Sequence, residues 1–103
     1  MKKSVLILYS RVGCCLCEGL EQRLREISLE RLHPPLTLVV IDIDSTQVTD
    51  SERTRYELKV PVMCIAEEDL SQMIELPRVS PRLNNEGLFA WFQRVIPKSL
   101  KLS

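Results

Sequence analysis

Three cysteines stand close together near the start of the chain, at Cys14, Cys15 and Cys17. Cys14 and Cys17 form a C-x-x-C motif, and residues three apart lie on neighbouring parts of a helix surface. Two thiols at this spacing can close a disulfide or share a metal ion. We favour redox chemistry, in which the Cys14 thiolate attacks a disulfide and Cys17 then resolves the mixed disulfide.

The position of the motif in the chain supports this interpretation. An apolar run over residues 5–9 predicts a buried strand before the motif, and an amphipathic pattern predicts a helix after it. Gly13 can adopt a positive φ between the two. The free N–H groups and the dipole at a helix start stabilise a thiolate. We therefore expect Cys14 to be the more exposed nucleophile, and Cys17, one turn further on, to be buried and to act second.

The other chemically interesting residues are expected to be structural. Strand alternation places Cys64 on the face opposite Pro61, so we expect it to be a buried small hydrophobe. His33 precedes two prolines and has no cysteine or carboxylate at ligand spacing, so we predict a surface residue and no metal site. We expect the presence of Cys15 to be incidental, although a third thiol could also join the exchange, take up a metal or link a dimer.

Length and composition indicate one compact domain. The chain has 103 residues, 45% of them hydrophobic, and a formal net charge of zero. This charge gives no global field to attract nucleic acid or an anionic membrane, and no apolar run approaches the ~20 residues that span a bilayer. In a reducing compartment, clustered cysteines indicate catalysis or metal binding rather than structural cross-links. We expect a monomeric cytoplasmic protein with a single domain over residues 1–103 and a frayed tail over 98–103.

Hydrophobic periodicity and helix breakers divide the chain into alternating strands and helices. The expected elements are a strand over residues 5–9, a helix from 15 to about 32, a strand over 36–43, a helix within 46–58, strands over 60–66 and 70–76, and a last helix from Asn84 or Asn85 to Pro97. Thr49 and Glu52 are spaced as a capping box, while Asp44 is another candidate cap. This order predicts an α/β fold with a four-stranded mixed sheet and helices on both faces.

The order β-α-β-α-β-β-α, the C-x-x-C after the first strand and Val60-Pro61 at the third strand together resemble the thioredoxin fold. Within it, the chain resembles the small glutaredoxin-like proteins over residues 5–96. The resemblance is carried by Gly13-Cys14-Cys15-Leu16-Cys17, by Asp42-Ile43-Asp44, and by Tyr56 followed by Lys59-Val60-Pro61-Val62. It implies that Pro61 is cis and faces the motif, that the Val60 backbone pairs with an extended thiol substrate, and that the proline ring shields Cys14 from metals.

The resemblance also implies a function, a small dithiol oxidoreductase that holds no bound cofactor and exchanges disulfides with a protein or with glutathione. Its reductant would be glutathione, a thioredoxin-type protein or a reductase. Glutaredoxins carry a Gly-Gly-x-x-Asp segment that holds glutathione, where this chain has Pro77-Arg78-Val79-Ser80-Pro81-Arg82. Arg11, where glutaredoxins often have lysine, and Arg78 or Arg82 are therefore candidates for binding an acidic partner.

Two other functions stay open at the level of sequence. Two copies could share a [2Fe–2S] centre through Cys14, with glutathione or Cys17 completing the ligand set. Alternatively, the chain could be a non-catalytic interaction module that keeps the fold and makes little use of its cysteines.

Overall fold

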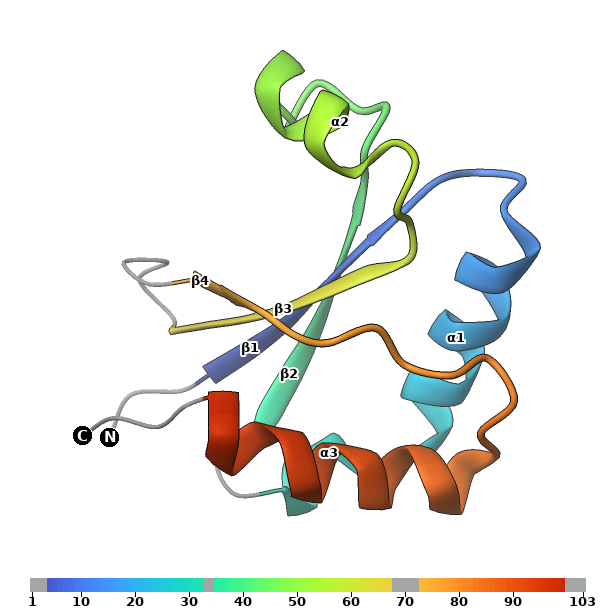
Figure 1. Cartoon of the computed structure of the whole chain (residues 1–103), viewed down its shortest axis with the longest axis vertical. Helices are drawn as coiled ribbons and strands as arrows, with labels where there is room; N and C mark the ends of the chain where they lie inside the picture. The colour runs from blue at the N-terminus through green and yellow to red at the C-terminus, as the bar shows by residue number, and fades with distance from the viewer. Residues whose placement is uncertain (1–3, 33–34, 68–72, 100–103) are drawn as a thin grey trace.

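The computed structural model describes residues 4–32, 35–67 and 73–99 (Figure 1). Its elements are β1 (Ser4–Ser10), α1 (Cys15–Glu26), the short 3₁₀ helix η1 (Leu29–Arg31), β2 (Leu36–Asp42), α2 (Asp50–Tyr56), β3 (Val62–Glu67), β4 (Met73–Glu75) and α3 (Asn85–Ser99). This order confirms the predicted α/β class. No helix in the described ranges combines the length and the apolar character needed to cross a membrane.

The four strands form one mixed sheet in the order β2-β1-β3-β4. β1 runs parallel to β2, with Ser4 opposite Leu36, and antiparallel to β3, with Tyr9 opposite Val62. β4 pairs antiparallel with β3 at the edge. Because β1 lies inside the sheet and is covered on both faces, its side chains form the continuous apolar run seen in the sequence.

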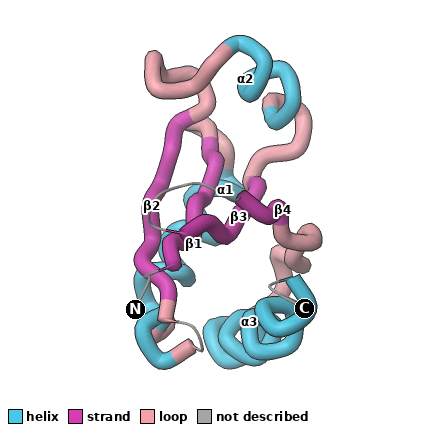
Figure 2. The backbone as a smooth tube through the Cα atoms, turned by 90° about the vertical axis from the view of Figure 1, so that its left-hand side faces the viewer, coloured by secondary structure: helices cyan, strands magenta, loops and turns pink. Residues whose placement is uncertain are grey.

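Two hydrophobic clusters lie on opposite faces of the sheet. The larger joins β1 and β3 to α1 and α3 and includes Leu6, Leu8, Leu20, Leu24, Met63, Ile65, Leu88, Trp91, Phe92 and Ile96. The smaller lies on the other face and includes Ile7, Tyr9, Ile43, Tyr56, Val62 and Cys64. α1 and α3 pack on the side of the larger cluster, whereas α2 contributes Tyr56 to the smaller one, and α2 and α3 lie on opposite sides of the sheet (Figures 1 and 2). Helices therefore contribute to both faces, as predicted.

Two predictions about single side chains are confirmed by these clusters. Cys64 is fully buried and belongs to the cluster opposite that of Met63, as strand alternation predicts. Trp91 and Phe92 are core residues whose rings meet edge to face at 5.0 Å between centroids. His33, the predicted strand residues 70–72 and the end of the predicted tail, 100–103, lie outside the described residues.

Three predicted boundaries are wrong. α1 ends at Glu26 rather than near residue 32, because Ile27 has an extended backbone, and η1 then turns Leu29 and Leu32 into the core. β3 begins at Val62 rather than residue 60, because a proline at 61 offers no N–H to a strand ladder. α3 continues past Pro97 to Ser99, since a proline in the last turn removes only one hydrogen bond from the helix.

Candidate active site

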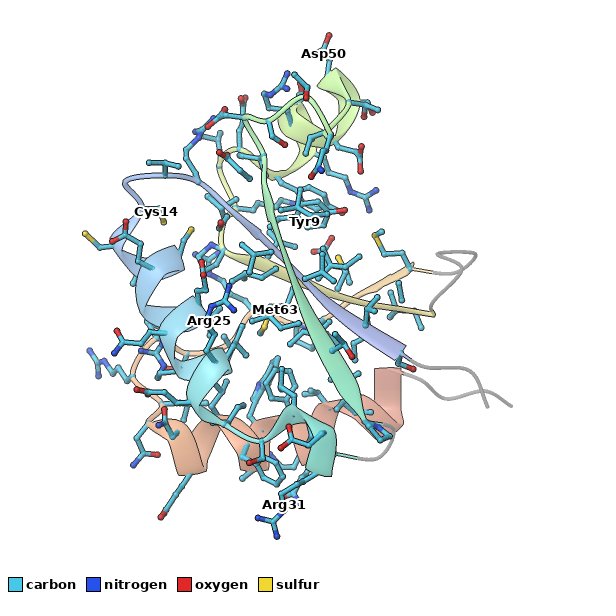
Figure 3. The ribbon with its side chains drawn as sticks, turned by 180° about the vertical axis from the view of Figure 1, so that it is seen from behind. Tyr9, Cys14, Arg25, Arg31, Asp50 and Met63 are labelled. Atoms are coloured by element: carbon cyan, nitrogen blue, oxygen red, sulfur yellow. The ribbon has the colours of Figure 1, made fainter. Side chains whose placement is uncertain are left out.

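The loop between β1 and α1 sets the position of the C-x-x-C motif. Gly13 turns the chain with a φ of +85°, in the left-handed region that glycine adopts readily. The Cys14 N–H donates to the Arg11 carbonyl oxygen at 3.1 Å, which closes the turn. Cys14 is then the N-cap of α1, with extended backbone angles (φ −88°, ψ 108°). Figure 3 shows Cys14 where this loop meets α1, at the end of the helix away from α3.

The Cys14 sulfur replaces the usual capping oxygen at this helix start. The Cys17 N–H donates to Cys14 Sγ at 3.3 Å. A donated hydrogen bond and the positive end of the helix dipole both stabilise negative charge on this sulfur. Cys14 is half-buried and Cys15 is exposed, and both are free thiols. The structure therefore presents Cys14 near the surface, with its sulfur at the start of the helix and accepting a backbone N–H.

Cys17 occupies the opposite kind of environment. Its side chain is only 1% exposed, in the first turn of α1. Burial, with a further contribution from its hydrogen bond to Cys14, raises the pKa of the Cys17 thiol to about 11. Cys17 therefore keeps its proton at neutral pH while Cys14 accepts hydrogen bonds. The two thiols of the motif have the order of exposure that the sequence predicts.

Val60 and Pro61 lie beside the start of α1. The Val60–Pro61 peptide bond is cis. Pro61 lines a groove together with Leu16, which belongs to the first turn of α1. The Val60 N–H donates to the Tyr56 carbonyl oxygen at 3.1 Å, so that donor is already used within the chain. Among the described residues, no backbone hydrogen bond to the Val60 carbonyl oxygen is present. The resemblance implied that the Val60 backbone pairs with an extended substrate, and the N–H is not free for this.

The three arginines named as candidates for binding an acidic partner lie in different places. Arg11 forms an ion pair with Asp44, with Nε and Oδ2 2.9 Å apart. Arg82 is exposed, and its backbone N–H donates to Ser80 Oγ at 3.3 Å. Arg78 Nη1 donates to the Lys59 carbonyl oxygen at 2.9 Å. Of these three side chains, Arg78 alone lines the groove beside Pro61.

We call this concavity the α1–Pro61 groove. It has a volume of about 100 Å³ and is lined by Leu16, Leu20, Arg23, Pro61, Arg78 and Val79. Arg23 was not predicted to belong to the site. A signal was present, because Leu16, Leu20 and Arg23 follow one another at spacings of four and three residues, which place them on one face of a helix.

The described residues contain no group of three or more histidine, cysteine or acidic side chains arranged to hold a metal ion. Cys64 lies within the core on the far face of the sheet, apart from the motif. The motif itself combines one accessible thiol with a buried thiol one turn away, which is the arrangement that a two-step thiol–disulfide exchange requires.

Comparison with known proteins places this site in context. Residues 5–93 of the sequence match the family model of the glutaredoxin-like domain (DUF836). No curated protein matches the chain. The first thioredoxin domain of mouse protein disulfide-isomerase A4 superposes with a TM-score of 0.58 at 17% identity, over 98% of this chain and 66% of that one.

Two further solved structures are similar in fold. G4, the poxviral disulfide oxidoreductase, has a TM-score of 0.52 at 16% identity, over 90% of this chain and 94% of that one. A structural-genomics target protein from X. campestris has a TM-score of 0.50 at 21% identity, over 87% and 97%. At these identities the similarity is one of fold.

Proposed function

This chain belongs to the glutaredoxin-like domain family and has the thioredoxin fold, and on that basis we propose that it is a small dithiol oxidoreductase. Cys14 is the nucleophile and Cys17 the resolving thiol. The observation that carries this proposal is the asymmetry of the pair. Cys14 Sγ caps α1 at the surface and accepts the Cys17 N–H at 3.3 Å, whereas the Cys17 side chain is buried.

The proposed reaction has two exchanges. The Cys14 thiolate attacks one sulfur of the substrate disulfide, the substrate S–S bond breaks, and the other sulfur leaves as a thiolate. Cys17 then loses its proton to that leaving thiolate or to water and attacks Cys14 Sγ. The Cys14–Cys17 disulfide forms, and the second substrate sulfur departs as a thiolate that takes a proton from water. The substrate gains two electrons and two protons, and an external thiol such as glutathione or a dithiol protein reduces the pair again.

The raised pKa of Cys17 fits the order of these steps. Part of that increase comes from the hydrogen bond to Cys14. Once Cys14 is in a mixed disulfide, its sulfur is neutral and accepts this hydrogen bond weakly. Ionisation of Cys17 then becomes easier at the stage that requires it, while before attack the proton on Cys17 keeps the second thiol inactive.

Exposed apolar side chains near Cys14 support a protein substrate. Val12 is 84% exposed and Leu16 48% exposed, and they lie two residues before and two residues after Cys14. Exposed apolar groups around a polar reactive centre are typical of surfaces that contact other proteins. We propose that an extended segment of the substrate lies across this surface and donates a backbone N–H to the Val60 carbonyl oxygen. Arg11, paired with Asp44, supports the loop before the motif rather than contacting substrate.

A comparison of the wild type with Cys14→Ser tests the proposal. Reduction of a mixed disulfide in the presence of glutathione, and of insulin in the presence of dithiothreitol, should be catalysed by the wild type and lost in Cys14→Ser. Cys15→Ser is the matched control, because it removes the neighbouring exposed thiol, and should remain active. Equal rates for wild type and Cys14→Ser would contradict the mechanism. A visible spectrum after anaerobic reconstitution with iron and sulfide would instead favour the cluster-binding alternative.

A further inference from the structure

We propose that the α1–Pro61 groove binds an acidic side chain of the protein substrate, close in sequence to the substrate's reactive cysteine. The inference rests on the proposed function for the identity of the partner, because it assumes that a substrate cysteine reaches Cys14. The groove would then select among disulfide-bearing proteins by charge. Arg23 and Arg78 are the groups that we assign to the recognition of the carboxylate.

The location of the groove favours contact with a bound substrate. Leu16 and Leu20 of α1 form one wall, and Pro61 and Val79 also line it. Leu16 lies in the first turn of the helix that Cys14 caps. A peptide joined to Cys14 by a disulfide therefore reaches the groove within a few residues of its own cysteine.

Arg23 has unused hydrogen-bonding capacity in this groove. Its Nε is buried and, among the residues that the structure describes, has no hydrogen-bond partner. A buried donor without a partner is costly, and a ligand atom that accepts its hydrogen bond removes that cost. Arg23 as a whole is only partly buried and lines the groove, so a ligand there can reach its guanidinium group. The Arg23 guanidinium is therefore the group in this groove for which a ligand acceptor would bring the largest gain.

Arg78 adds a second positive charge to the same groove. Its Nη1 is held by the Lys59 carbonyl oxygen at 2.9 Å, which fixes the guanidinium in place. The described ion pairs occupy other arginines, Arg11, Arg25 and Arg53, with Asp44, Glu21 and Asp50 as their partners. No acidic side chain is among the described residues that line the groove. Two arginines therefore line the groove, and the nearest acidic side chain among the described lining residues is Glu75, in the neighbouring cavity that shares Pro61, Arg78 and Val79 with the groove.

An acidic side chain fits this arrangement in charge, shape and size. A carboxylate accepts paired hydrogen bonds from a guanidinium, and its aliphatic stem can lie on the apolar wall of Leu16, Leu20 and Val79. The volume of about 100 Å³ suits one side chain, whereas sites for whole small ligands usually measure about 300–1,000 Å³. The groove itself therefore suits one side chain, and the neighbouring cavity of about 280 Å³, which shares Pro61, Arg78 and Val79, offers room for the residues on either side of it.

The test uses pairs of disulfide-linked peptides that differ only by Glu or Gln, placed at each of the three positions on either side of the cysteine. At the best position, we expect wild-type kcat/KM to be about tenfold higher for the Glu peptide, the size of one charge-assisted hydrogen bond. Arg23→Gln and Arg78→Gln should each bring this Glu/Gln ratio towards one. Arg25→Gln, an exposed arginine on the same helix paired with Glu21, is the matched control and should leave the ratio unchanged.

Other outcomes overturn the inference. A wild-type Glu/Gln ratio of kcat/KM near one at every position would show that the groove does not distinguish a charged from a neutral side chain. A ratio that stays high in both Arg23→Gln and Arg78→Gln would show the same. An arginine-dependent rate confined to glutathione disulfide would identify the tripeptide as the occupant instead. If the wild type reduces neither peptide, the proposed function fails, and the inference is then decided by calorimetric binding of the reduced peptides to Cys14→Ser. Tighter binding of the Glu peptide supports it, and equal binding refutes it.

Discussion

Arg11 and Asp44 form a two-point ion pair, with 2.9 Å between Nε and Oδ2 and 3.0 Å between Nη2 and Oδ1. The pair joins the loop that precedes Cys14 to the loop that follows β2. Asp44 is held in turn by Asp42, whose Oδ1 accepts the Asp44 N–H at 2.9 Å. The carboxylates that close the second strand therefore help to position the nucleophile, although neither one contacts it.

Removing this ion pair should affect activity more than stability. The two side chains are 37% and 47% exposed, and ion pairs between solvent-exposed side chains add little to the free energy of unfolding. We expect Arg11→Gln and Asp44→Asn to lower the rate of disulfide reduction to the same extent, and the double variant to be no worse than either. A larger loss in Arg11→Gln alone would mean that Arg11 contacts substrate directly.

The Arg11–Asp44 ion pair also has a defined pH dependence. The Arg11 guanidinium lowers the pKa of the Asp44 carboxyl below its usual value. The stabilising contribution of the ion pair is therefore present above the usual carboxyl range and is lost as pH falls through the lowered pKa.

Cys17→Ser should trap the first covalent intermediate. Without the resolving thiol, the Cys14–substrate disulfide has no internal partner and accumulates. Mass spectrometry of Cys17→Ser mixed with a disulfide-linked peptide should show a one-to-one adduct that dithiothreitol removes. Cys14→Ser treated in the same way should show no adduct at that position. An adduct found instead on Cys15 would reassign the nucleophile.

Alkaline pH should destabilise the reduced protein. Burial is the main reason that the pKa of both Cys17 and Cys64 is raised to about 11. In the unfolded chain these thiols ionise near their ordinary value, so the stability they contribute is complete below that value and is lost as pH rises towards 11. Each such thiol reduces the free energy of unfolding by up to about 1.4 kcal/mol per pH unit in this window.

Urea unfolding at pH 8 and pH 10 measures this effect, with Cys64→Ala as the comparison. The variant should be less stable at pH 8, because it leaves a small cavity in the core. It should also lose less stability between the two pH values than the wild type does. Equal losses of unfolding free energy between pH 8 and pH 10 in the two proteins would show that the Cys64 pKa is the same in the folded and unfolded chain.

Gly13 and Gly19 offer a matched pair of substitutions. An alanine Cβ at Gly13 would meet no atom within 4 Å, but the φ of +85° would strain it. We expect Gly13→Ala to lower the free energy of unfolding by about 1–2 kcal/mol and to slow disulfide reduction, since this turn positions Cys14.

Gly19 lies inside α1, where a Cβ makes only an ordinary 3.6 Å contact with Arg23. Gly19→Ala should therefore raise the free energy of unfolding by about 0.5–1 kcal/mol. Urea unfolding measures both changes in stability. A Gly13→Ala variant with unchanged stability and activity would show that the positive φ at this turn is not needed to position Cys14.

The parts of the fold that could be predicted depend on signals between near neighbours. The start of α2 follows from the capping box, in which the Glu52 N–H donates to Thr49 Oγ1 at 3.1 Å and the Thr49 N–H donates to Glu52 Oε1 at 3.0 Å. Asn84 caps α3, because its Oδ1 accepts the Gly87 N–H at 2.8 Å. Each of these contacts spans three residues, so the residue types alone reveal it.

The end of α1 could not be predicted in this way. Leu29 and Leu32 continue the apolar spacing of the helix, and a continued helix or a separate 3₁₀ turn would bury them equally well. The structure uses the turn, which depends on the extended backbone of Ile27. Periodicity reports which side chains are buried and does not report where a helix is interrupted.

The same distinction applies to the site. The difference between Cys14 and Cys17 follows from their places in one helix turn, and the sequence predicted it. The α1–Pro61 groove joins Arg23 of α1 to Arg78 from the segment after β4, which are far apart in the chain. Asp44 was expected to cap a helix, but Thr49 caps α2 and Asp44 binds Arg11. Such pairings depend on how the elements pack, which no short motif encodes.

The interior position of β1 determines which parts of the molecule open last. Its backbone is paired along its length with both β2 and β3, whereas β4 contributes three residues at the edge. Backbone amides in doubly paired strands exchange with deuterium only in the rarest openings, and short edge segments exchange readily. The strand that leads to Cys14 should thus keep its amide protons longest, and molecules in which β4 has transiently opened should still hold Cys14 at the start of α1.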